Sequence, residues 1–104
     1  MTQKKLAIAL TTAPDNPSTA TTLKIARVAM EKNIAVYLYV TDDGVFNLKD
    51  EALFKLSADG ARLYVCAYGC QERKLPTNDP RATYCGLVVL SNLVEGCDRF
   101  LDLN

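Results

Sequence analysis

Apolar and polar residues alternate along this chain in blocks. Three blocks are almost continuously apolar, at residues 6–10, 34–40 and 61–65. Runs of this kind are typical of strands that are covered on both faces of a parallel sheet. A further apolar block at residues 99–103 predicts a final strand.

Between these runs, apolar residues recur at helical spacing. Residues 23–30 place their apolar side chains on one helical face, and residues 48–56 do so over a shorter length. A third short helix is expected after Cys66. Residues 87–94 predict a buried helix that ends at Gly96.

Polar and turn-forming residues separate the predicted elements. Residues 11–22 are rich in Thr, Ser, Asp, Asn and Pro, so we expect a loop in which Ser18 or Thr19 caps the first helix. Asn33 is the expected end of that helix. Residues 41–44 predict a turn after the second strand.

The alternation of strands and helices predicts an α/β protein, a three-layer α/β/α sandwich around a mainly parallel five-stranded sheet. Residues 1–104 are expected to form a single domain, because this length suits one hydrophobic core. In a parallel sheet the carboxyl ends of the strands share one edge, where ligands bind. The segments at 11–22, at 41–48 and after Cys66 are therefore expected to meet there.

The charge balance limits the classes of partner. The 12 basic and 12 acidic residues cancel to zero formal charge, whereas a nucleic-acid-binding face is expected to be basic. A low net charge also permits self-association. The apolar run at 6–10 is too short for a signal peptide, and no stretch approaches the length of a membrane span. We therefore expect a cytoplasmic protein that binds neither nucleic acid nor membrane.

Four cysteines and no histidine limit the available chemistry. The cysteines do not resemble a secreted disulfide framework, and no Cys-x2-Cys knuckle suggests zinc. No Gly-x-Gly-x-x-Gly sequence follows the first strand, which disfavours a dinucleotide. Asp42 and Asp43 follow a strand, but we expect them to form a turn with Gly44. We therefore predict no metal and no cofactor.

Cys66 and Cys70 are candidate catalytic residues because they flank a strand-to-helix corner. The apolar strand leads into Cys66, and Cys70 is expected near the start of the next helix, with Arg73 close behind. A helix N-terminus and a guanidinium both lower the pKa of a nearby thiol, so we expect a lowered pKa at Cys70, with Glu72 opposing the shift. Gly69 permits a tight corner or a close approach of substrate. Each cysteine also has an alternative role as a small buried apolar residue.

The other two cysteines are less favoured. Cys85 lies between Tyr84 and Gly86, just before the last predicted helix, and either packs or reaches the same edge; we favour packing. Cys97 precedes the final strand and therefore lies at the opposite edge, so we expect a structural role.

A series of short features occurs in the order seen in a known family. They are Pro14-Asp15 after the first strand, an Ala-rich first helix, Asp43-Gly44-Val45 after the second strand, Cys66 at the end of the third, Arg73 in the next helix, Gly86 before the last helix and the closing Cys97-Asp98-Arg99-Phe100-Leu101. In this order and spacing the chain resembles the DsrE/DsrF-like family of small sulfur-relay proteins, which includes the TusD sulfur carriers. It departs at Lys74, where a glycine commonly follows the arginine.

The resemblance implies a sulfur-relay function. Family members that act in sulfur relay carry a persulfide on a cysteine at the third strand-to-helix corner. The cysteine of TusD-like members corresponds to Cys66, and the cysteine of other members corresponds to Cys70. Cys66 is thus the first and Cys70 the second choice for the catalytic thiol, with Gly69 and Arg73 binding substrate or stabilising the thiolate. The resemblance also implies sulfur donor and acceptor proteins or small persulfides as partners, and a homotrimer or hexamer.

Two alternative functions stay open on the sequence. The chain fits a non-catalytic module for ligand binding or oligomeric assembly. It also fits a thiol-redox sensor that forms a disulfide between Cys66 and Cys70.

Overall fold

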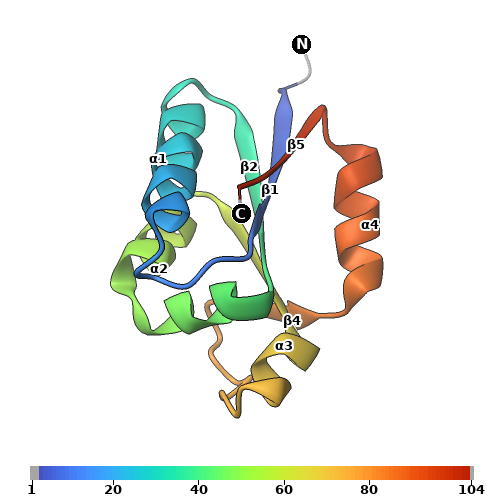
Figure 1. Ribbon diagram of the computed structural model, residues 1–104. Helices are drawn as coiled ribbons and strands as arrows, with labels where there is room; N and C mark the ends of the chain where they lie inside the picture. The colour runs from blue at the N-terminus through green and yellow to red at the C-terminus, as the bar shows by residue number, and fades with distance from the viewer. Residues whose placement is uncertain (1–2, 104) are drawn as a thin grey trace.

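Strands and helices alternate throughout residues 3–103, which are the residues that the computed structural model describes (Figure 1). In chain order the elements are β1 (Lys5–Leu10), α1 (Pro17–Glu31), β2 (Ala35–Val40), the 3-10 helix η1 (Asp42–Lys49), α2 (Glu51–Ala58), β3 (Arg62–Cys66), α3 (Ala67–Glu72), β4 (Thr83–Cys85), α4 (Leu87–Gly96) and β5 (Arg99–Asp102). This order confirms the predicted α/β class.

The strands form one five-stranded sheet in the order β4-β3-β2-β1-β5, and every neighbouring pair is parallel. At the carboxyl edge, Val40 of β2 pairs in register with Leu10 of β1 and with Val65 of β3. Strand β4 was not predicted as an element, because three residues are too few to show a period. It extends the sheet beyond β3 by pairing Cys85 with Cys66.

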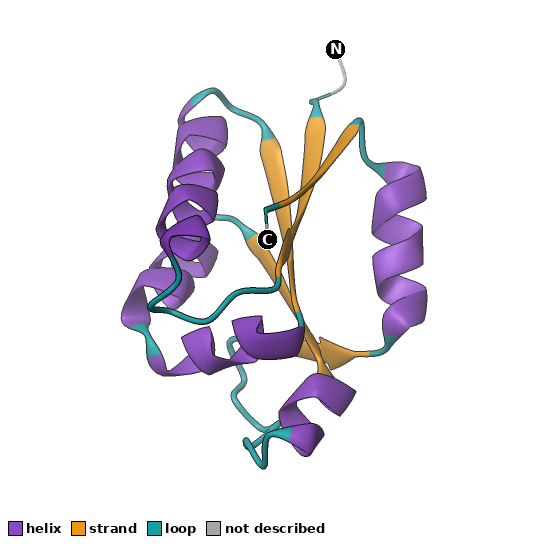
Figure 2. Cartoon of the chain, viewed as in Figure 1, coloured by secondary structure: helices purple, strands orange, loops and turns teal. Residues whose placement is uncertain are grey.

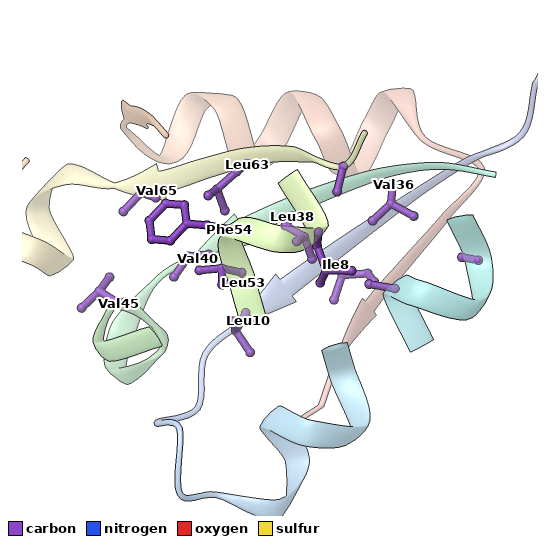
Figure 3. Packing of buried hydrophobic residues seen from close by; sticks show 14 of the residues in the cluster. Ile8, Leu10, Val36, Leu38, Val40, Val45, Leu53, Phe54, Leu63 and Val65 are labelled. Atoms are coloured by element: carbon purple, nitrogen blue, oxygen red, sulfur yellow. The ribbon is translucent and has the colours of Figure 1, made fainter. Parts of the chain in front are cut away.

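Helices cover the two faces of the sheet unequally (Figure 2). Helices α1 and α2 lie on one face, and α4 lies alone on the other. The strand side chains on the α1 and α2 side, such as Leu38 and Val65, form the apolar core with Leu53 and Phe54 (Figure 3). This arrangement confirms the predicted three-layer sandwich.

Helix α4 is more exposed than its composition suggested. The sequence predicted a buried helix at residues 87–94, but no residue of α4 is buried. Leu87 is 67% exposed and Val88 is 74% exposed. The prediction of a buried helix was wrong because α4 packs against the sheet on one side only and its apolar residues extend beyond that side.

Helix α1 begins earlier than predicted, at Pro17. The Asn16 side chain caps it by accepting a hydrogen bond of 2.9 Å from the Ser18 amide. Thr19 is buried instead, and its hydroxyl lies 2.6 Å from that of Thr12. The predicted loop is confirmed at residues 11–16. Its extension to residue 22 and the predicted caps Ser18 and Thr19 were wrong, since the proline and hydroxyl residues belong to the first turns of the helix.

Three helices end at a residue with positive φ. These residues are Asn33 at 62°, Gly60 at 122° and Lys74 at 57°. In each case the following amide donates to a carbonyl in the last turn of the helix, which is the Schellman arrangement. Asn33 thus ends α1 as predicted. The left-handed conformation also explains why a glycine suits the position of Lys74.

Gly44 brings η1 against the end of β1. A Cβ atom at Gly44 would lie 2.0 Å from the Leu10 carbonyl oxygen, far inside van der Waals contact. The same carbonyl accepts a hydrogen bond of 3.1 Å from the Thr41 amide. Asp42 and Asp43 begin η1, so the predicted turn continues as a 3-10 helix. The absence of a side chain at Gly44 is therefore a condition for the close packing of this edge.

We expect the Gly44→Ala substitution to lower the free energy of unfolding by about 3 kcal/mol or more, because backbone must move to admit the methyl group. Gly96→Ala is the control, since a Cβ there meets no atom within 4 Å and alanine favours a helix by up to about 1 kcal/mol. Urea unfolding followed by circular dichroism measures both. Equal effects at the two glycines would contradict the close contact.

Candidate functional site

The segments that follow β1, β2 and β3 meet at the carboxyl edge of the sheet, as predicted. The Asn47 side-chain amide, from η1, donates to the Thr12 carbonyl at 2.9 Å. The Arg73 guanidinium, just after α3, forms an ion pair of 3.0 Å with Asp43 of η1. The edge is therefore a connected layer of loops and short helices around the end of β3.

Cys66 lies at this edge, between the ends of β2 and β4. It is the last residue of β3 and the N-cap of α3. Its sulfur accepts a hydrogen bond of 3.4 Å from the Gly69 amide, one of the helix N-terminal donors that lack a partner within the helix. The residue is 5% exposed. The corner thus holds Cys66 in a defined position, with an N–H group on its sulfur.

Cys70 lies within α3 and is fully buried, in the same apolar core as Val45 and Val65. Burial raises the pKa of its thiol, the neighbouring Cys66 raises it further, and Arg73 opposes both only in part. The prediction of a lowered pKa at Cys70 was therefore wrong. Burial removes water from the thiolate and so destabilises it. This effect outweighs the stabilisation that the helix N-terminus and the guanidinium provide.

Arg73 and Gly69 support the corner through the backbone. The Arg73 guanidinium donates to the Gly69 carbonyl at 3.2 Å as well as to the Asp43 carboxylate. It also lies 6.0 Å from the centre of the Phe46 ring. These contacts join α3 to η1 and hold Gly69, whose amide contacts Cys66. A direct role of Arg73 in binding substrate stays a prediction.

Two residues that the sequence analysis did not assign to the site lie beside Cys66. Cys85 of β4 pairs with Cys66 in register, and its thiol donates to the Val65 carbonyl over 3.7 Å. The fully buried Tyr39 hydroxyl, from β2, donates to the Gly86 carbonyl at 3.1 Å. Burial raises the pKa of Tyr39, and the nearby Cys66 and Cys85 raise it further.

The sequence held only a partial signal for these two residues. Alternation within β2 places Tyr39 on the opposite face from Leu38 and Val40, but it does not show which strand lies beyond β3. The position of Cys85 depends on β4, whose short length hides it. The cluster of Cys66, Cys85 and Tyr39, which we call the thiol cluster, is therefore a product of the strand order.

Cys97 lies far from this cluster in the fold. It follows α4 and precedes β5 at the amino-terminal edge of the sheet, near Lys5 and Asp98. Within residues 3–103, no group of three or more Cys, Asp or Glu side chains is arranged to hold a metal ion. No helix in the same range has the length and apolarity to cross a membrane.

A five-stranded parallel sheet, in which the last residue of β3 is a cysteine that caps α3, defines this chain as a small α/β protein with a candidate thiol site. Residues 4–103 match the DsrE/DsrF-like family. The match spans nearly the entire chain, and the protein therefore belongs to the DsrE/DsrF-like family. Membership supports a role in sulfur relay.

Solved structures share the fold at low sequence identity. The ychN protein from E. coli matches with a TM-score of 0.79 and 18% identity, over 98% of this chain and 100% of that chain. A conserved protein of unknown function, BT1422 from Bacteroides thetaiotaomicron, matches with a TM-score of 0.76 and 15% identity, over 96% of this chain and 95% of that chain. No curated protein is significantly similar in sequence. These likenesses show the fold.

The buried thiols and Tyr39 predict a protein that is less stable at high pH. Burial raises the pKa of Tyr39, Cys70 and Cys85, so the folded state retains protons that the unfolded chain has lost. The contribution of these three groups to the free energy of unfolding should be constant below the ordinary cysteine pKa of about 8.5 and fall as pH rises through that value and past about 10.

Urea titrations in the presence of reductant, at several pH values, measure this decline. In the Tyr39→Phe variant, the free energy of unfolding should fall less steeply above about pH 10, because this buried tyrosine no longer titrates. At neutral pH the variant should be about 1 kcal/mol less stable, since the Gly86 carbonyl loses its partner. A stability that is independent of pH in the wild type would contradict the assignment.

Proposed function

We propose that this protein is a small sulfur-relay protein that carries a persulfide on Cys66. The observation that carries the proposal is the position of Cys66 at the carboxyl end of β3, where parallel α/β folds present reactive groups, with the Gly69 amide on its sulfur. Membership of the DsrE/DsrF-like family supports the sulfur-relay theme. Cys70 is the second choice, since it is buried and its pKa is raised.

The chemistry is thiol exchange at a persulfide. The Cys66 thiolate attacks the outer sulfur of a donor persulfide, forming a new sulfur–sulfur bond while the donor leaves as a thiolate. An acceptor thiolate then attacks the outer sulfur on Cys66, and Cys66 leaves as a thiolate. Neither step changes the total oxidation state or requires a histidine base.

The surrounding residues have positioning roles in this proposal. The Gly69 amide is a suitable partner for a sulfur that carries negative charge, both before attack and after transfer. Arg73 orients Gly69 by binding its carbonyl and anchors α3 through Asp43. Arg73 is thus proposed to act through the backbone of the corner.

The proposed partners are sulfur donor and acceptor proteins or small persulfides, in the cytoplasm. Because Cys66 is only 5% exposed, a donor reaches its sulfur only when the neighbouring chain moves. A small persulfide needs a smaller movement than a folded partner does, so small donors are the simpler probe.

Incubation of the reduced protein with glutathione persulfide tests the proposal. At early times the intact mass should increase by one sulfur atom, and peptide mapping should place it on Cys66. Cys66→Ser should reduce the transfer by about tenfold or more, because the attacking thiol is lost. Cys97→Ser, at the opposite edge, should behave like the wild type.

The alternative functions give different results in the same experiment. A non-catalytic binding or assembly module gains no sulfur on either Cys66 or Cys70, which would refute the carrier function. Transfer that maps to Cys70 and survives in Cys66→Ser would move the carrier role to Cys70.

We also propose that the protein self-associates through α4. Its residues Leu87, Val88 and Val94, together with Phe100 of β5, are large apolar side chains exposed to solvent. Contiguous exposed apolar residues mark protein interaction sites, and the zero net charge permits contact between copies. Contact between two copies through this surface would bury the exposed apolar residues on the face of the sheet that only α4 covers. A homotrimer or hexamer is the expected assembly.

Light scattering coupled to size exclusion measures the assembly. We expect Val88→Asp to shift the mass toward the monomer, because a carboxylate in an apolar contact loses its hydration. Val28→Asp is the matched control, since Val28 is an exposed valine on α1, on the other side of the sheet. A monomeric wild type, or an equal shift in both variants, would rule out association through α4.

A further inference from the structure

Cys85 is the cysteine that the sheet places directly beside Cys66. The two residues pair in register across β3 and β4, so their side chains leave the same face of the sheet. Neighbouring strands lie about 4.8 Å apart, which falls within the range of about 4.4–6.8 Å between the Cα atoms of disulfide-linked cysteines. The backbone therefore already has the spacing that a Cys66–Cys85 disulfide requires.

The present position of the Cys85 sulfur supports the same pairing. Its thiol donates to the carbonyl of Val65, the residue that precedes Cys66. Both cysteines are free thiols in this structure. Strand β4 is a short edge strand, bonded to the sheet on one side only, so fewer hydrogen bonds oppose its movement toward Cys66 than would oppose the movement of an inner strand.

The third member of the thiol cluster holds this arrangement in place. Tyr39 reaches from β2 to the carbonyl of Gly86, the residue after Cys85, with a hydrogen bond of 3.1 Å. Burial is the largest cause of the raised pKa of the Tyr39 hydroxyl, and Cys66 and Cys85 both contribute to it because their sulfurs lie near it. Tyr39 thereby fastens the junction of β4 and α4 next to Cys66.

Cys70 is less suited to react with Cys66. It belongs to the apolar core between the sheet and the α1 and α2 layer, whereas Cys66 is outside that cluster. Cys70 is 0% exposed, so solvent does not reach its thiol to stabilise the thiolate that an attack requires. Cys85 is only partly buried. The redox pair that the sequence suggested, Cys66 with Cys70, is thus less favourable than Cys66 with Cys85.

We propose that Cys85 is a resolving thiol that discharges the Cys66 persulfide when no acceptor takes the sulfur. The proposal rests on the proposed persulfide at Cys66. The Cys85 thiolate attacks the inner sulfur, the one bonded to the Cys66 carbon; a Cys66–Cys85 bond forms and the outer sulfur leaves as hydrosulfide. The outer sulfur is reduced and the two cysteines are oxidised to a disulfide, so no further oxidant is needed.

The resolving step competes with transfer to an acceptor. Burial raises the pKa of the Cys85 thiol, and only a thiolate attacks. Discharge is therefore slow near neutral pH, which leaves time for an acceptor to remove the sulfur first. The disulfide then blocks Cys66 until a cellular thiol reduces it, so the pair also reports an excess of persulfide over acceptor.

The experiment follows the reduced protein after a short exposure to glutathione persulfide and removal of the donor. In the wild type we expect the mass of the added sulfur to disappear, both thiol hydrogens to be lost, and hydrosulfide to appear in equal amount. Mapping should find a Cys66–Cys85 disulfide. In Cys85→Ser the persulfide on Cys66 should persist about tenfold longer or more, because the neighbouring nucleophile is absent. Cys97→Ser should match the wild type.

The outcomes separate this inference from the carrier function. If no variant gains sulfur on Cys66, the carrier function fails and the resolving role fails with it. If Cys66 gains sulfur but the wild type and Cys85→Ser lose it at the same rate, only the resolving role is overturned. A disulfide that maps to Cys66 and Cys70 also overturns it. Circular dichroism and urea unfolding of reduced Cys85→Ser check that the variant is folded.

Discussion

Parallel pairing of β1, β2 and β3 is the constraint on which the rest of the structure depends. Because parallel strands all end on the same edge, it brings three segments that are distant in the sequence into one layer. Contacts such as the Arg73–Asp43 ion pair then join these segments. The packing of this layer tolerates no side chain at Gly44, whose α-carbon lies against the Leu10 carbonyl. The chemistry at Cys66 depends on this layer, since it positions the Gly69 amide.

Burial and the position relative to the start of α3 together distinguish the cysteines at this edge of the sheet. Cys70 lies on α3 with Arg73 nearby, yet burial dominates and raises its pKa. Cys66 lies only four positions earlier but caps the helix and accepts an amide hydrogen bond. Cys85, at the sheet edge, keeps partial access to solvent. Neighbouring thiols on one sheet edge thus occupy three different environments, which suits a division of roles among them.

Much of the fold was predictable because burial leaves a direct trace in the sequence. The continuous apolar runs of β1, β2 and β3 predicted a parallel sheet, and Asn33 marked the end of α1. The start of α1 was not predicted, because Pro17 and Ser18 suit both a loop and a first helical turn. The exposure of α4 was not predictable either, since an apolar composition does not reveal whether a second layer covers the helix.

For the candidate site, the sequence by itself determined which nucleophilic chemistry the residues offer. A chain with four cysteines and no histidine offers thiol exchange as its nucleophilic chemistry, and the end of the third apolar run located Cys66. Only the tertiary structure decided which groups surround that sulfur. Strand order places Cys85 and Tyr39 beside it, and burial sets the pKa of Cys70. Strand order and burial arise from contacts between distant segments, whereas a local pattern records only the preferences of its own residues.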